Sequence, residues 1–253
     1  MNDEKAPSPS RRQLFKSLTF VPIAAIGVAG CAKESDKPAF GTSAAPGSSS
    51  AAPGSSSAAP GEYRPAFFNA AEWAFVLAAC DRLIPVDNIG PSAGQAGVPE
   101  FIDRHMQTPY ASGDIWYMQG PFVEAAPQFG YQGRLPVRDI LRVGIKGIDA
   151  HCQKHFSGKT FAQLEHAEQE TLLKAAEAGK LELENISAKE FFTQLLNETR
   201  MGYFCDPQHG GNKNMSAWKM IGYPGMRADY TNWVEVRNQP YPLPPVDLAG
   251  KRG

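Results

Sequence analysis

Apolar residues recur every three to four positions through much of the chain, which is the spacing of one buried face of an α-helix. The pattern is clearest over residues 69–84, 138–156 and 166–178, and again from Ser187 onwards. Alternating apolar and polar residues, typical of a half-buried strand, do not extend over any useful length. The pattern therefore predicts an all-α fold.

Local signals mark where these helices begin and end. Asn69 followed by Glu72 predicts a helix start with a capping box, and Ser187 followed by Glu190 predicts a second one. Pro85 would end the first helix, since proline lacks the N–H that a helix needs. We expect a short helix over residues 100–105 and another that stops at Gly179. Residues 113–130 are aromatic and predict no clear element, and from Asp206 onwards the sequence is loop-like.

The first 30 residues have the order of an export signal. Arg11 and Arg12 lie in a polar stretch, and residues 18–30 form an apolar segment without charge. That segment has about 13 residues, which is too short to cross a ~30 Å hydrocarbon core as a helix. The arginine pair resembles a twin-arginine (Tat) signal, the type that carries folded cargo. The alternative is a chance arginine pair in an ordinary Sec signal.

A lipidation site and a linker follow this signal. Residues 28–31 resemble a lipobox, in which Cys31 would carry the lipid; the alternative is simple cleavage nearby. Residues 31–64 contain repeats of Ala-Ala-Pro-Gly-Ser-Ser-Ser, which cannot bury apolar area and predict a disordered linker. We expect a tether for a helical domain over residues 65–239, although a spacer without any role would look the same. A Pro-rich tail over residues 240–253 ends the chain.

Composition narrows the classes of function. The chain has 253 residues, 42% of them hydrophobic, which is enough for one core. With 25 basic and 26 acidic residues its formal net charge is −1, so it lacks the basic surface that nucleic-acid binding requires. No apolar run is long enough for a polytopic membrane protein.

Catalytic motifs are missing from the sequence. It contains no dinucleotide-binding Gly-x-Gly-x-x-Gly, no Cys-x-x-Cys-His for covalent haem, no strand followed by a Gly-x-Ser-x-Gly elbow and no His-Glu-x-x-His. We therefore assign no catalytic, cofactor-binding or metal-binding residue. His151 and His155 are spaced to share one side of a helix, as zinc ligands can. A third ligand is not evident and Lys154 lies between them, so surface histidines are the favoured interpretation.

The chain has four cysteines: Cys31, Cys80, Cys152 and Cys205. If Cys31 carries a lipid, an odd number remains for an oxidising compartment. Cys80 lies on the apolar face of its helix and is predicted to be a core residue. Cys152 and Cys205 are disulfide candidates, which would pair either with each other or with another chain.

Two separated blocks of sequence resemble one known family. The later block contains Gly202-Tyr203-Phe204, Asp206-Pro207, Gly210-Gly211-Asn212, Trp218 and Gly222-Tyr223-Pro224-Gly225. The earlier block contains Cys80-Asp81-Arg82-Leu83-Ile84-Pro85, Gly90-Pro91-Ser92-Ala93-Gly94 and Val98-Pro99-Glu100-Phe101-Ile102-Asp103. Together, over roughly residues 65–235, they resemble the gluconate 2-dehydrogenase subunit 3 family.

The resemblance implies an accessory subunit rather than an enzyme. In such complexes a flavoprotein of the glucose–methanol–choline type carries FAD and oxidises a sugar or polyol. A multihaem cytochrome c subunit, which holds haem c, passes the electrons on. The small subunit binds neither cofactor, and it escorts the flavoprotein, which lacks a signal of its own, through the Tat translocase. We therefore expect a periplasmic protein, associated with the membrane through its complex and through any lipid on Cys31.

Four aromatic residues of the later block are candidates for the partner interface: Tyr203, Phe204, Trp218 and Tyr223. Aromatic side chains on loops are common interface anchors. The alternative is that they close one end of the helical core. A competing interpretation of the whole chain is an independent periplasmic lipoprotein with its own binding role, or with a metal at His151 and His155.

Overall fold

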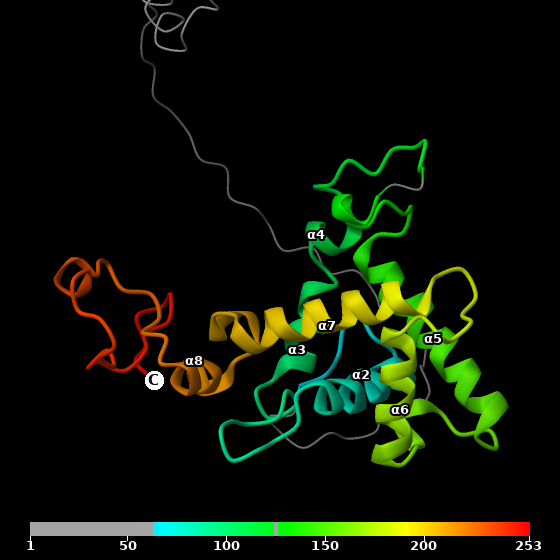
Figure 1. The fold of residues 1–253 in the computed structure, drawn as a ribbon, viewed down its shortest axis with the longest axis horizontal. Coiled ribbons are helices and arrows are strands. Elements are labelled where there is room, and N and C mark those ends of the chain that lie inside the picture. The colour runs from blue at the N-terminus through cyan, green and yellow to red at the C-terminus, as the bar shows by residue number, and fades with distance from the viewer. Residues whose placement is uncertain (1–62, 124–125) are drawn as a thin grey trace, which may run out of the picture. The chain divides into compact units, whose positions relative to one another are not determined.

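The computed structural model describes residues 63–123 and 126–253. The predictions for Arg11, Arg12 and Cys31, and for nearly all of the linker, lie outside the described residues. Within them the chain forms one helical body without strands (Figure 1), and the pairing of extended backbone is limited to isolated bridges around Val246. The predicted all-α fold is confirmed.

The described part contains seven α-helices and five short 3-10 turns, which are joined by loops. The helices are α2 (Ala70–Leu83), α3 (Val98–His105), α4 (Pro109–Ser112), α5 (Val137–His155), α6 (His166–Glu177), α7 (Ala188–Phe204) and α8 (Ser216–Ile221). The 3-10 turns are η1 (Pro127–Phe129), η2 (Phe161–Gln163), η3 (Pro207–His209), η4 (Lys213–Met215) and η5 (Thr231–Trp233). Among the helices of these residues, none combines the length and the apolar character that a membrane span requires.

The predicted helices agree with the structure to within a few residues. At the start of α2, the Asn69 side chain accepts hydrogen bonds from the backbone N–H groups of Ala71 and Glu72, both at 3.0 Å. Glu72 in turn accepts from the Asn69 N–H at 2.9 Å, which completes the predicted capping box. At the start of α7, Ser187 accepts from the Glu190 N–H at 3.1 Å. The Glu190 carboxylate accepts a hydrogen bond from the Gln194 side-chain amide and not from the Ser187 N–H. The second predicted capping box is therefore only half formed.

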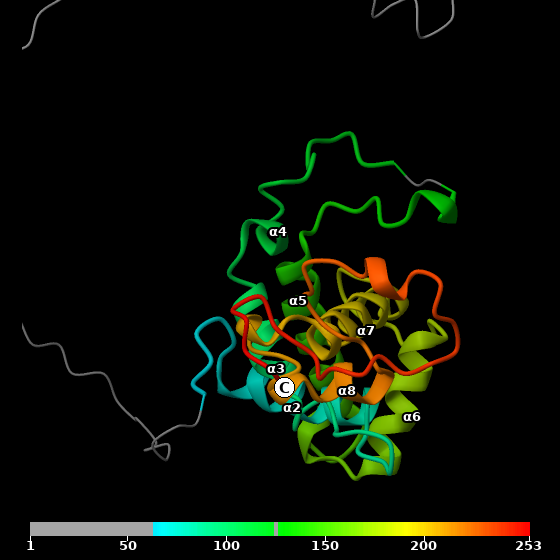
Figure 2. The ribbon, with the colours of Figure 1, turned by 90° about the vertical axis from the view of Figure 1, so that its left-hand side faces the viewer.

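Helix α7 lies at the centre of the helical body. It packs against α2, α3, α5 and α6, and runs across them in Figure 1. Its core-facing Phe191 lies beside Phe75 of α2, with ring centroids 6.0 Å apart, and Phe75 in turn meets Phe161 of η2 at 4.6 Å. All three rings are fully buried. Figure 2 shows α7 nearly end-on, with α6 to one side of it.

Two glycines allow α7 to approach its neighbours closely. A Cβ atom added at Gly144 of α5 would overlap the ring of Phe191. A Cβ atom added at Gly202 of α7 would lie 2.7 Å from Cδ1 of Phe101 in α3. Because interiors are packed at crystal-like density, neither ring has free space into which it could retreat. The helix crossings therefore depend on the absence of a side chain at these two positions.

A fully buried carboxylate fixes the segment that precedes α2. Asp103 of α3 accepts hydrogen bonds from the Tyr63 hydroxyl at 2.8 Å and from the backbone N–H groups of Ala66, Phe67 and Phe68 at 2.8, 3.0 and 2.9 Å. Burial, followed by the hydrogen bond to Asp103, raises the pKa of Tyr63 to about 12. The hydroxyl therefore stays protonated and remains a donor. One side chain thus holds residues 63–68 against α3.

A second buried carboxylate joins α7 to α3. Glu198 of α7 lies 2.7 Å from Nδ1 of His105 at the end of α3. The His105 ring lies between Phe101 and Tyr110, with centroid separations of 5.1 and 4.8 Å. This contact ties α3 and the start of α4 to the central helix.

The end of the chain, which the sequence sets apart as a Pro-rich tail, folds back onto the loops after α7. The backbone N–H of Leu248 donates to Asp206 at 2.8 Å. Val246 forms bridges with Gly225 and Arg252, and the Met226 N–H donates to the Val246 carbonyl at 2.7 Å. The last residues therefore help to hold the loops between α8 and the C-terminus.

We predict that Gly144→Ala destabilises the protein by about 2 kcal/mol or more, because the new methyl group overlaps the buried Phe191 ring. Gly147→Ala in the same helix is the matched control, since its Cβ would meet only the Leu183 side chain, at 3.3 Å. Alanine is the better helix former, so this control should be neutral or stabilising. Urea unfolding of both variants measures the difference, and equal midpoints would contradict the close crossing.

We predict that Asp103→Ala costs about 3 kcal/mol, because it removes a fully buried carboxylate that accepts hydrogen bonds from three backbone N–H groups and from the Tyr63 hydroxyl. Hydrogen exchange should show lost protection of the amides of residues 66–68 in particular. Glu177→Ala removes an exposed carboxylate from α6 and should leave both measurements unchanged.

Candidate functional site

The sequence block from Gly202 to Gly225 closes one end of the helical body, where α7 meets α8. Asn212 is fully buried in the left-handed conformation, with φ of 44°. Its side-chain amide donates to the Cys205 carbonyl at 3.0 Å, and its oxygen accepts from the Ala217 N–H at 2.9 Å. Next to it, a Cβ at Gly211 would overlap the Gly202 carbonyl. The Gly-Gly-Asn turn therefore acts as a buried connector between the two helices.

The structure separates the four aromatic interface candidates into two pairs. Tyr203 and Trp218 are only 2% and 3% exposed. The Tyr203 hydroxyl donates to the Pro91 carbonyl and the Trp218 N–H donates to the Phe204 carbonyl, both at 2.8 Å. Tyr203 and Trp218 therefore close one end of the helical core, which was the alternative to an interface role. Their buried rings are not available to a partner.

Phe204 and Tyr223 form the exposed pair, at 42% and 38%. Phe204 lies edge-on to Tyr203 at 5.2 Å, and Tyr223 lies edge-on to Trp218 at 5.1 Å. Each exposed ring is thus supported by a buried aromatic neighbour. We call these two residues the Phe204–Tyr223 surface. A large apolar group that is already ordered loses little side-chain entropy on binding, which suits a protein interface.

The three described cysteines, Cys80, Cys152 and Cys205, are all free. Cys80 is buried beside Thr199, so its predicted core position is confirmed. Cys152 is fully buried in α5, and Cys205 is partly buried directly after α7, so the two candidates are not bonded to each other. Burial raises the pKa of Cys205 to about 11 and that of Cys152 to about 12, which keeps both as thiols near neutral pH. A bond from either to another chain stays a prediction.

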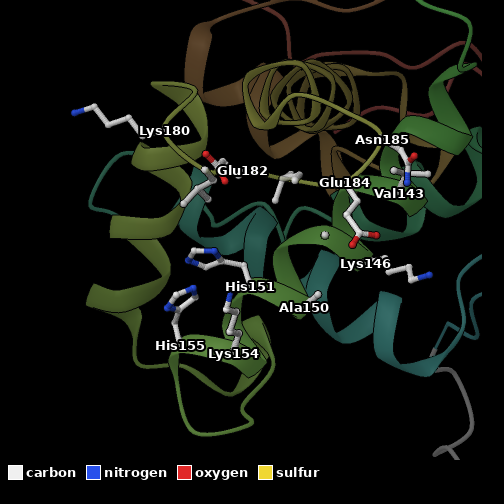
Figure 3. Close-up of a pocket in the computed structure, with 13 residues that line it drawn as sticks. Val143, Lys146, Ala150, His151, Lys154, His155, Lys180, Glu182, Glu184 and Asn185 are labelled. Carbon is white, nitrogen blue, oxygen red and sulfur yellow. The ribbon is translucent and has the colours of Figure 1, made fainter.

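His151 and His155 lie in a groove of about 540 Å³ between α5 and residues 180–185. Their ring centroids are 4.4 Å apart, which places them side by side on α5, as Figure 3 shows. Burial, together with the charges of His155 and Lys154, lowers the pKa of His151, so its ring is neutral at neutral pH.

The charged residues around this pair are Lys146, Lys154, Lys180, Glu182 and Glu184. The groove is thus lined by both cations and carboxylates. Within residues 63–123 and 126–253, no three or more His, Cys, Asp or Glu side chains are grouped closely enough to hold a metal ion. The arrangement brings the two histidines together without adding a third ligand to them.

The structure also reveals an apolar surface on the segment for which the sequence pattern predicts no clear element. The backbone after α4 extends away from the helical body in Figure 1, and this segment carries six exposed apolar side chains: Ile115, Trp116, Tyr117, Phe122, Val123 and Phe129. We call them the aromatic loop. A cavity of about 630 Å³ lies at its base, against the start of α5. The signal in the sequence is a dense group of aromatic residues in a stretch without helical periodicity.

Comparison of the sequence with known protein families finds one family that matches. The model of the gluconate 2-dehydrogenase subunit 3 family matches residues 70–225, from the start of α2 to the end of the Gly-Tyr-Pro-Gly motif. No curated protein and no solved structure matches the chain. The matched region contains the central helix, the buried Gly-Gly-Asn turn and the Phe204–Tyr223 surface, and it makes up more than half of the chain. The protein therefore belongs to the gluconate 2-dehydrogenase subunit 3 family.

Proposed function

We propose that this protein is the non-catalytic small subunit of a flavin-dependent sugar or polyol dehydrogenase that faces the periplasm. The catalytic partner is a glucose–methanol–choline-type flavoprotein with FAD, and a multihaem cytochrome c subunit with haem c accepts the electrons. The observation that carries the proposal is the family match over residues 70–225. It spans the helical core and both sequence blocks that resemble the family.

The escort role needs two parts of the chain, the N-terminal signal and the helical domain. The Tat pathway carries folded cargo, so a flavoprotein without a signal can cross the membrane if it is bound to a partner that has one. Arg11 and Arg12 would be recognised by the Tat translocase, and the helical domain would hold the cargo. The same interaction would stabilise the flavoprotein after export, with Cys31 as the lipid attachment site.

The Phe204–Tyr223 surface is the part of the described chain best suited to hold that cargo. Its two rings are exposed, and each is supported by a buried aromatic residue. It lies within the block of sequence by which the family is identified. Phe204, Ile221 and Tyr223 are the exposed large apolar side chains of that block, and the two rings are the ones that rest on buried aromatic residues. Of the free cysteines, Cys205 directly follows Phe204 and is the one through which a bond to the partner would form.

We predict that Arg11→Lys with Arg12→Lys leaves the flavoprotein subunit in the cytoplasm, because the pair is the recognition element of a Tat signal. Cell fractionation with a flavin assay of each fraction measures this. Arg134→Lys with Arg237→Lys makes the same chemical change at exposed positions of the folded domain and should leave export unchanged. Normal export of the flavoprotein with the first double variant would contradict the escort role.

We predict that Phe204→Ala with Tyr223→Ala weakens binding of the flavoprotein subunit roughly 30-fold or more, the effect of losing about 2 kcal/mol of aromatic contact. Co-purification from the periplasm and a titration of the purified subunits measure the loss. The control, Ile89→Ala with Val234→Ala, truncates exposed apolar residues elsewhere. Unchanged affinity in the first double variant, with thermal unfolding like that of the control, would assign the interface to another surface.

A further inference from the structure

The aromatic loop exposes six large apolar side chains within one segment of the chain. Tyr117 is 85% exposed and Phe129 is 72% exposed, and the other four members are at least 43% exposed. Scattered exposed apolar residues are ordinary, but five of these six, all except Ile115, line one cavity. They are therefore grouped on one surface, and a grouped apolar surface marks an interaction site.

The base of the loop is held by the helical body. The Trp116 N–H donates to the Tyr110 carbonyl at 3.1 Å, and the two rings meet edge-on at 5.4 Å. Tyr110 stacks on His105, which contacts the buried Glu198 of α7. The chain of contacts from Trp116 therefore reaches the centre of the fold. The exposed rings are presented on a supported base.

The composition of the loop suits a lipid surface better than a protein surface. It combines tryptophan, tyrosine and phenylalanine, the residues that gather where a bilayer meets water. The sequence from Gly113 to Gly133 includes two acidic residues and no lysine or arginine. Protein interfaces are rimmed by polar and charged groups that pair across the contact. A projecting loop with few charges can instead enter the apolar edge of a bilayer.

The point where the N-terminal segment joins the domain gives the second argument. Tyr63, the first described residue, donates to Asp103, and the Arg104 guanidinium lies 5.5 Å from its ring centre. Both contacts are at the end of α3, and α4 begins at Pro109, directly before the aromatic loop. The segment that leads back to Cys31 therefore starts close to the base of the loop. The linker that the sequence predicts for this segment would span ~30 Å as a coil.

We propose that the aromatic loop inserts into the membrane–water interface and forms a second attachment beside the lipid on Cys31. A lipid anchor of limited strength gains from a second signal, because two attachments to one surface act together. A domain held at two points would also keep a constant orientation relative to the bilayer. The inference relies on the proposed function only for placing the domain at a membrane, and its quenching measurement needs no dehydrogenase subunit.

Depth-dependent quenching of tryptophan emission tests this directly. The full-length protein, purified from membranes with its N-terminus as processed in the cell, is reconstituted into vesicles of acyl-chain-brominated or ordinary phosphatidylcholine. We expect the brominated lipid to quench part of the emission, because Trp116 reaches the acyl chains. Trp116→Phe should abolish the quenched component, whereas Trp233→Phe should retain it. Bromine quenches only on contact, so a lipid on Cys31 does not itself produce the signal.

A second variant tests insertion without removing the fluorophore. Tyr117→Asp with Val123→Asp places charges at two exposed positions of the loop, so folding should be preserved and quenching should be lost. Ile89→Asp with Val234→Asp is the matched control and should remain quenched. Quenching that is absent from the wild type, or that persists in Trp116→Phe, would overturn the proposal. So would a loop variant that stays quenched but no longer binds the flavoprotein, because the loop would then be a protein interface.

Discussion

The close approach of α7 to its neighbours is the constraint on which the rest of the structure depends. Gly144 lets α5 approach Phe191, and Gly202 lets α3 approach the far end of α7. Because these contacts leave no space for a Cβ atom, the position of α7 is fixed near both of its ends, at Phe191 and at Gly202. The residues that follow Gly202 therefore leave the helical body from a fixed position. The proposed partner surface at the end of α7 inherits its geometry from these helix crossings.

The family signature is mostly a structural device. Gly211 and Asn212 pack the turn between α7 and α8, and Tyr203 and Trp218 close the core behind it. Its polar groups are largely satisfied within the fold, which is the requirement for any buried polar group. The pair of rings that these residues support is exposed, and it is the surface that we propose for the partner.

The two exposed apolar surfaces lie on separate parts of the helical body, one after α7 and one after α4 (Figure 1). A subunit that carries a flavoprotein and also sits on a membrane needs two such surfaces, because a single face cannot be covered by both at once. The proposed roles divide accordingly, with the protein contact beside the signature and the lipid contact beside the segment that leads to the N-terminus. The charged groove at His151 and His155 is chemically different from both.

The sequence by itself determined the all-α class, the caps at Asn69 and Ser187 and the buried position of Cys80, because periodicity and capping depend on neighbours within one or two turns. Tertiary structure decided which of four similar aromatic residues face solvent, and that α8 follows a turn held by Asn212. It also decided that residues near Leu248 return to Asp206, and that Cys152 and Cys205 stay apart. These outcomes depend on contacts between distant parts of the chain, which local pattern does not encode. The long irregular segments were the hardest to predict because their geometry comes from α7, which lies elsewhere in the sequence.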